Sequence, residues 1–169
     1  MDKEQEKILR EKMTSLLEKS LDNPNLDQTH TKRLIEENGY LFEKLSTVAS
    51  IIEMYLGSKR TAGKLFLNDI SMAYHIYEEL TSEKIPYIDR FTIDSFGREI
   101  GKNLKLLENH MEDLKVSNPI YLEYVGRVLN SWIETNMVPE EALLMLKDWL
   151  VLIPQLVSRQ KQKDIVNSN

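Results

Sequence analysis

The sequence predicts an all-α protein, folded as a compact bundle of about six helices. Apolar residues recur every three or four positions through nearly every segment, which is the period of an amphipathic helix. The 169 residues include only six glycines and five prolines, too few for the many tight turns of a β-sandwich or barrel. No hairpin turn signal joins two segments of alternating polarity. Together these observations favour helices over strands.

The composition narrows the class of protein. Hydrophobic residues make up 41% and charged residues 29% of the chain, as in an ordinary soluble domain. The most apolar run, residues 143–157, contains Lys147, Asp148 and Pro154, so it is too short and too charged to span a bilayer. The chain has no cysteine, which excludes thiol catalysis and disulfides, and its N-terminus lacks the apolar core of a secretory signal. We therefore predict a cytoplasmic protein without a membrane segment.

Three helices are predicted in the first half of the chain. Residues 1–22 form an amphipathic helix, which an Asn-Pro-Asn sequence ends. The second helix covers residues 27–56, and Gly39 is the place where it kinks or divides. The third covers about residues 62–81, where the apolar positions fit a period of 3.6 better than a period of two.

Three further helices are predicted in the second half. One runs from Ile88 or Thr92 to Lys115 and ends at a Ser-Asn-Pro sequence, because the residue before a proline avoids the helical region. The next covers residues 120–135. The last begins at Pro139, where a proline and two acids suit the first turn of a helix. The chain then divides into an N-terminal helix, a helical domain and a mobile basic tail, at residues 1–22, 27–157 and 158–169.

Catalytic and metal-binding patterns are missing from the sequence. The three histidines, His30, His75 and His110, lie far apart and have no metal-ligand spacing. Adjacent glutamates point about 100° apart on a helix, so they do not form an acid–base pair. Residues 57–64 resemble a phosphate-binding loop but have one residue too many between the glycines. We therefore predict a protein that is not an enzyme and holds no metal and no cofactor.

The most informative stretch contains two aromatic residues. Tyr124, Val128 and Trp132 follow one another at four-residue steps, which places them on one face of a helix. In one interpretation the three side chains pack in the core, since aromatic residues bury large areas. In the other, one edge of the face is exposed and contacts DNA or a protein partner, and the adjacent Arg127 neutralises a phosphate.

Residues 106–142 resemble the C-terminal half of the DnaD domain of Gram-positive bacteria and their phages. The resemblance depends on a helix that ends in a short polar break, a helix with Tyr124, Val128 and Trp132 at four-residue steps, a turn at Asn136, and an acidic helix start at Pro139. It implies a helical accessory module of DNA replication. Such a module binds DNA weakly and without sequence preference, and it helps to assemble replication proteins.

The basic tail offers a second candidate for DNA binding. Arg159, Lys161 and Lys163 follow Pro154, where the apolar stripe thins out, so we expect three cations without nearby partners on a mobile segment. Such a cluster is either a solubilising end or an electrostatic handle for DNA. The net charge of −5 argues against a basic surface that coats nucleic acid.

Two other functions stay open. The first is a regulatory protein that binds a protein partner through a helical groove, or through an apolar face that also allows a homo-oligomer. The second is a small-molecule sensor with an apolar cavity in an all-α fold, similar to globin-like sensors without haem. DNA binding that weakens steeply with salt separates the replication module from both.

Overall fold

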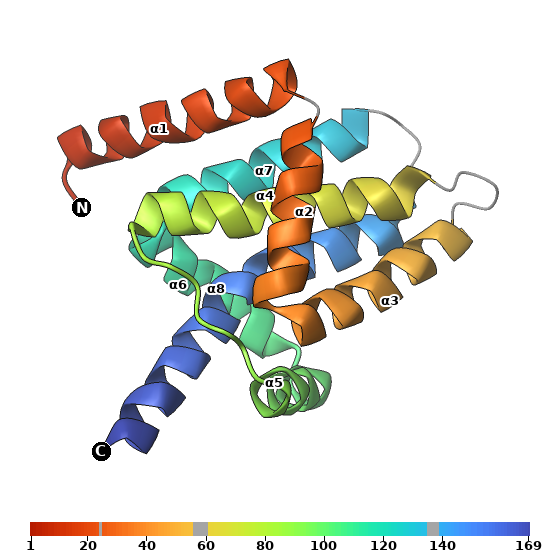
Figure 1. The fold of residues 1–169 in the computed structure, drawn as a ribbon, viewed down its shortest axis with the longest axis vertical. Helices are drawn as coiled ribbons and strands as arrows, with labels where there is room; N and C mark the ends of the chain where they lie inside the picture. Colours follow the sequence, from red (N-terminus) through yellow and green to blue (C-terminus); the bar gives the residue numbers. More distant parts are fainter. Residues whose placement is uncertain (24, 56–60, 135–138) are drawn as a thin grey trace.

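The computed structural model describes residues 1–23, 25–55, 61–134 and 139–169, and these ranges contain eight helices and no strand (Figure 1). The prediction of an all-α fold is therefore confirmed. The helices are α1 (Lys3–Asp22), α2 (Asn25–Glu37), α3 (Gly39–Tyr55), α4 (Thr61–Thr81), α5 (Arg90–Lys102), α6 (Lys105–Ser117), α7 (Pro119–Glu134) and α8 (Glu140–Ser168). Within the described ranges, no helix is both long and apolar enough to cross a membrane.

The described residues form eight helices rather than about six because two of the predicted helices are divided. The segment 27–56 separates into α2 and α3 at Asn38, beside the glycine that marked the break. The segment 88–115 separates into α5 and α6 at Asn103, whose backbone is extended and whose side chain accepts a hydrogen bond from the N–H of Lys105 at 3.2 Å. Asparagine side chains compete with helical hydrogen bonds in this way. The apolar residues keep a helical period across Asn103, so the sequence pattern does not show that the helix ends there.

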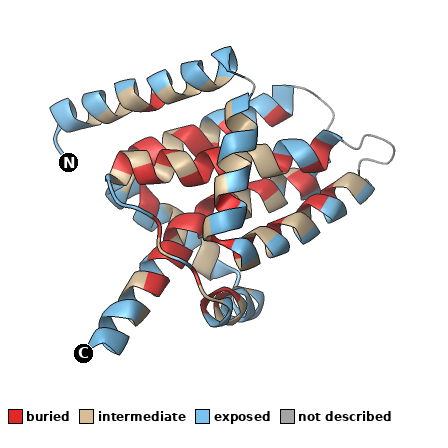
Figure 2. Ribbon diagram, in the orientation of Figure 1, coloured by how far each residue is buried: buried red, intermediate tan, exposed pale blue. Residues whose placement is uncertain are grey.

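The core is built around α4 and α8. Helix α4 contacts α1, α2, α3, α7 and α8, and α8 contacts α3, α4, α5, α6 and α7. Ile70, Ala73 and Ile76 of α4 are fully buried, as are Leu146 and Leu150 of α8. Buried residues cover most of α4 in Figure 2, whereas α1 is largely exposed. Helix α1 therefore packs on the outside of the core.

Helix α8 is longer than the sequence predicts. It continues through Pro154, which is buried inside the helix, and ends at Ser168. The apolar run 143–157 therefore packs against the other helices, and the residues after it form the last turns of the same helix. In Figure 1 this end of α8 projects from the body of the protein.

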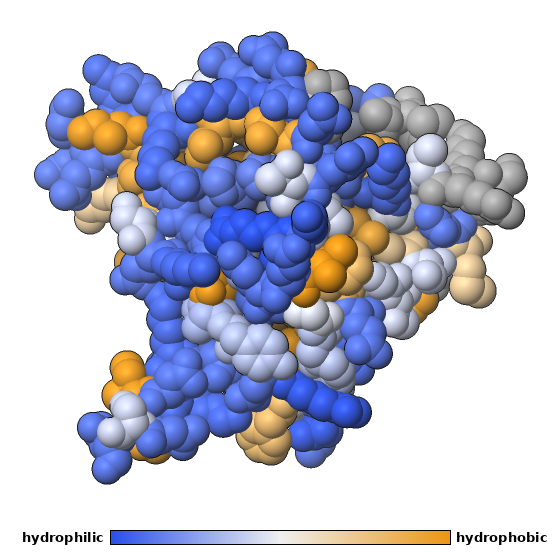
Figure 3. Space-filling view, viewed as in Figure 1, coloured by the Kyte–Doolittle hydropathy of each residue, from blue (hydrophilic) through white to orange (hydrophobic). Residues whose placement is uncertain are grey.

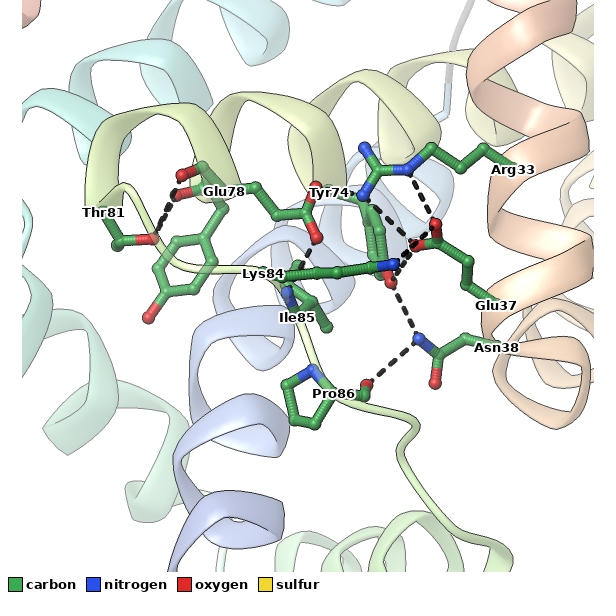
Figure 4. Close-up of polar contacts among 10 residues, drawn as sticks. Arg33, Glu37, Asn38, Tyr74, Glu78, Thr81, Lys84, Ile85 and Pro86 are labelled. Atoms are coloured by element: carbon green, nitrogen blue, oxygen red, sulfur yellow. Dashed lines mark hydrogen bonds and ion pairs between the residues drawn. The ribbon is translucent and has the colours of Figure 1, made fainter.

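A buried polar network holds the α4–α5 connection in place (Figure 4). The Asn38 side chain, which is fully buried, donates to the Tyr74 hydroxyl at 2.8 Å and to the Pro86 carbonyl at 3.2 Å, and it accepts from the Ile88 N–H at 2.6 Å. The Glu78 carboxylate accepts from the Ile85 N–H at 2.7 Å. These side chains satisfy one another and the extended backbone, as buried polar groups must. The network therefore stabilises the fold at the α4–α5 connection.

Candidate functional site

Tyr124, Val128 and Trp132 lie on the buried face of α7, with 2%, 9% and 6% of their surface exposed. Their four-residue spacing places them on one side of the helix, as predicted, and this side faces α4. The Tyr124 hydroxyl donates to the backbone carbonyl of Asp69 at 2.9 Å, and the Trp132 indole N–H donates to Asp69 Oδ2 at 2.6 Å. The burial and these two hydrogen bonds agree with a role in core packing.

The same three side chains also line a groove between α1, α2, α4 and α7. The groove contains a cavity of about 450 Å³ that is open to solvent rather than enclosed. Its lining residues are Leu17, Ser20 and Leu21 of α1, Asp27 of α2, Leu65, Asn68, Asp69 and Met72 of α4, and Tyr124, Arg127, Val128, Ser131 and Trp132 of α7. We call this cavity the α4–α7 groove. Its walls are mostly apolar, which is typical of a binding site.

Helix α1 forms one wall of the α4–α7 groove and is held by few contacts. Met13 is its only fully buried side chain. Arg10 pairs with Glu123 of α7 through N–H···O distances of 2.9 and 2.5 Å, and Lys12 Nζ lies 3.2 Å from a Glu79 carboxylate oxygen of α4. In the space-filling view hydrophobic residues are seen along the side of α1 that faces the body (Figure 3). This wall is the part of the groove with the weakest attachment.

Asp69 is one of the two carboxylates that line the groove. Burial raises the pKa of Asp69 to about 6; the hydrogen bond from Trp132 opposes this change, and the charge of Asp27 adds to it. Burial has this effect because an apolar environment disfavours the charged form of an acid. At neutral pH the groove therefore presents a desolvated negative charge.

Arg127 is the cation of the groove, and it lies at the surface. It is exposed, whereas Asp69 is half-buried, and it forms no ion pair with any residue that the structure describes. Its charge lowers the pKa of Glu123, an effect for which the hydrogen bond from Arg10 is the main cause. Of the charged residues that line the groove, the two acids are thus half-buried and Arg127 is exposed.

The tail residues do not join this groove. Arg159 pairs with Glu99 of α5 at 2.7 Å, Lys163 pairs with Asp89 at 2.5 Å, and Lys161 pairs with Glu83. The guanidinium of Arg159 also lies over the Phe96 ring, 4.1 Å from its centroid. The expectation of three cations without nearby partners is therefore wrong. The acidic partners of the tail lie 60 to 78 positions earlier in the chain. Local sequence patterns therefore do not predict these pairs.

Asp69 is the site residue that the sequence interpretation missed. The sequence does mark Asp69 as unusual, because its helical neighbours three and four positions away are all apolar. These neighbours are Leu65, Phe66, Met72 and Ala73. A charged residue inside an apolar stripe needs a partner or a function.

The histidines lie outside the groove. His30 of α2 and His75 of α4 stack with ring centroids 4.2 Å apart, and His110 of α6 lies against Phe96. Within the described residues no group of three or more histidine, aspartate or glutamate side chains is arranged to hold a metal ion.

Comparison with known proteins gives no match: no family model fits the chain, and neither curated proteins nor solved structures are significantly similar to it. Two of the sequence interpretations concern segments outside the described residues. These segments are 57–60 of the loop that resembles a phosphate site and 135–138 of the DnaD-like region.

Proposed function

We propose that this chain is a non-enzymatic, cytoplasmic interaction module that binds a segment of another protein in the α4–α7 groove. The observation that carries the proposal is the open cavity of about 450 Å³ with mostly apolar walls. Grooves between helices commonly receive the apolar face of a partner helix. The walls come from four helices, so the groove exists only in the folded domain.

Charge favours a protein partner over DNA. Among its described lining residues, the groove has two acids, Asp27 and Asp69, and one cation, Arg127, and acids in a site repel phosphates. Trp132 is 6% exposed and donates to Asp69, so stacking on a base would require it to leave that position. The tail cations already have acidic partners. The cavity is also open on one side, which suits a peptide better than an enclosed small molecule.

The replication-accessory role that the DnaD resemblance implies is a second candidate. The observation in its favour is Arg127, which is exposed and forms no ion pair with the described residues. If this residue contacts a phosphate, Arg127→Gln should weaken DNA binding equally for all sequences and reduce the slope of log affinity against log salt by about one. No DNA shift by the natural chain at low salt would exclude this role.

A peptide-display experiment tests the proposal. A random peptide library is selected on the natural chain, and the enriched peptides are then measured on Leu65→Glu, which places a charge in the groove at a residue that is 52% exposed. The matched control is Val116→Glu on α6, where the residue is 83% exposed and lies outside the groove. We expect the peptides to bind the natural chain and the control but not Leu65→Glu. The proposal is wrong if no peptide is enriched or if all three proteins bind equally.

A further inference from the structure

Among the residues that the structure describes, no cation pairs with the Asp69 carboxylate. No lysine, arginine or histidine of the described residues forms an ion pair with Asp69 or with Asp27. Asp69 accepts the Trp132 indole N–H, and Asp27 accepts the Ser20 hydroxyl at 3.2 Å. Both acids line the same groove. The fold therefore leaves two neighbouring negative charges in an apolar cavity.

An occupant without a positive charge would fit this groove poorly. A purely apolar segment would remove the remaining water from Asp69 and supply nothing in return, which is unfavourable for a charged group. An acidic segment would be repelled. A lysine or arginine side chain instead packs its aliphatic stem along apolar walls, here those of Met72 and Val128, and brings its charge to the carboxylate.

The different burial of the acids and of Arg127 indicates how a bound segment is oriented in the groove. The charge of Asp27 acts on Asp69 and raises its pKa further, after burial and against the Trp132 hydrogen bond. Arg127 is exposed, whereas Asp69 and Asp27 are half-buried. A basic side chain that enters the groove therefore meets the two acids inside it, and Arg127 remains available for an acidic group nearer the surface.

We infer that the occupant of the α4–α7 groove is a helix-forming peptide segment of a partner protein with an apolar face and one lysine or arginine, whose cation pairs with Asp69 and Asp27. This inference rests on the proposed function and adds the chemistry of the partner. It makes Asp69 the residue that selects the partner, while the apolar walls supply the contact area.

The first test selects the same peptide library separately on the natural chain and on Asp69→Asn. Asparagine keeps an oxygen for the Trp132 N–H and removes the charge. We expect apolar peptides with a basic residue at a fixed position from the natural chain, and apolar peptides without that preference from Asp69→Asn. Peptides without any basic preference from both proteins would overturn the inference and leave the proposed function intact. The absence of enriched peptides from both would overturn the proposed function itself.

The second test is a double-mutant cycle on one selected peptide. Replacing its basic residue by glutamine should weaken binding to the natural chain by at least about tenfold, as for other close charge pairs at interfaces, and should have little effect on binding to Asp69→Asn. Asp113→Asn on α6, where the side chain is 71% exposed, is the control and should behave as the natural chain does. An equal loss in all three proteins would place the peptide cation elsewhere and overturn the inference.

A competition experiment separates a peptide from a small cation. Spermidine and lysine methyl ester carry the charge without the apolar face, so neither should displace the selected peptide at concentrations comparable to its own. Displacement at such concentrations would show that the groove is a site for small amines, and the inference of a peptide partner would then be wrong.

Discussion

At the scale of single residues, Asp69 connects the stability of the fold with the chemistry of the groove. Its backbone carbonyl accepts the Tyr124 hydroxyl and its carboxylate accepts the Trp132 indole N–H, so Tyr124 and Trp132 of α7 are both fixed on α4 through one residue. The same carboxylate lines the groove and is desolvated. A charge in this position destabilises the free protein, and binding of a cation would relieve that penalty.

Removal of the Asp69 charge should stabilise the protein at neutral and higher pH. Burial raises the pKa of Asp69 from 3.8 to about 6, so the folded state binds more protons than the unfolded state between these values. The penalty is therefore fully present above pH 6 and disappears as the pH falls toward 3.8. We expect Asp69→Asn to be more stable by about 1–2 kcal/mol near pH 8, with no such advantage near pH 4. Urea unfolding at both pH values measures this; a destabilised variant near pH 8 would contradict it.

Trp132 should contribute mainly through packing. Trp132→Ala is expected to lower the free energy of unfolding by about 3–5 kcal/mol, because it leaves a large cavity beside α4. Trp132→Phe keeps most of the ring and loses the hydrogen bond to Asp69, with an expected loss of about 1–2 kcal/mol. Ile133→Ala is the control, since that neighbouring side chain is 54% exposed and should change little. If urea unfolding gives equal stability for Trp132→Ala and the natural chain, the packing role is excluded.

At the scale of elements, α8 has two parts with different tasks. Its first part fills the core, as the buried Leu146 and Leu150 show. Its last turns hold the start of α5. Gln160 is 4% exposed and accepts from the Asp89 N–H at 3.0 Å and from the Thr92 hydroxyl at 2.9 Å. The segment that the sequence predicts to be a tail therefore contacts the start of α5 and supports the fold.

Deletion of residues 158–169 should lower the melting temperature. It removes the buried hydrogen bonds of Gln160 and the ion pairs of Arg159 and Lys163, with an expected loss of about 2–4 kcal/mol in the free energy of unfolding. Deletion of residues 165–169 alone is the control, because these residues are exposed and their removal should leave the melting temperature nearly unchanged. Thermal unfolding followed by circular dichroism compares the three chains. Equal melting temperatures for all three would mean that the end of α8 does not support α5.

At the scale of the whole molecule, the stacked histidines join helix α2 to α4 of the core. His30 and His75 connect α2 with α4 at a centroid distance of 4.2 Å. Burial lowers the pKa of both imidazoles. For His30, the charges of His75 and Arg33 add to this effect and the charge of Asp27 opposes it. For His75, the charge of Glu79 opposes the effect and those of Arg33 and Lys12 add to it. Helices α1 and α2 both contribute walls of the groove, so the attachment of α2 is part of the geometry of the site.

The stability of the molecule should fall when these histidines become protonated. Because the folded pKa values lie below 6.5, the unfolded state binds more protons, and stability is lost as the pH falls below 6.5. We expect His75→Phe, which keeps a stacked ring without a titrating group, to lose less stability than the natural chain between about pH 7 and pH 5. Urea unfolding across this range gives the two curves. Parallel curves would exclude the histidine pair as a source of pH dependence.

The sequence by itself determined the helical class and most helix positions, because the period of apolar residues is a local property of the chain. It also placed Tyr124, Val128 and Trp132 on one helix face. Tertiary structure decided which helices meet, and this made Asp69 the partner of Trp132 and gave acidic partners to Arg159 and Lys163. It also gave Asn38 its buried contacts, which separate α2 from α3. The physical reason is that burial, pKa and ion pairing depend on neighbours in space, and in this fold those neighbours lie many positions apart in the chain.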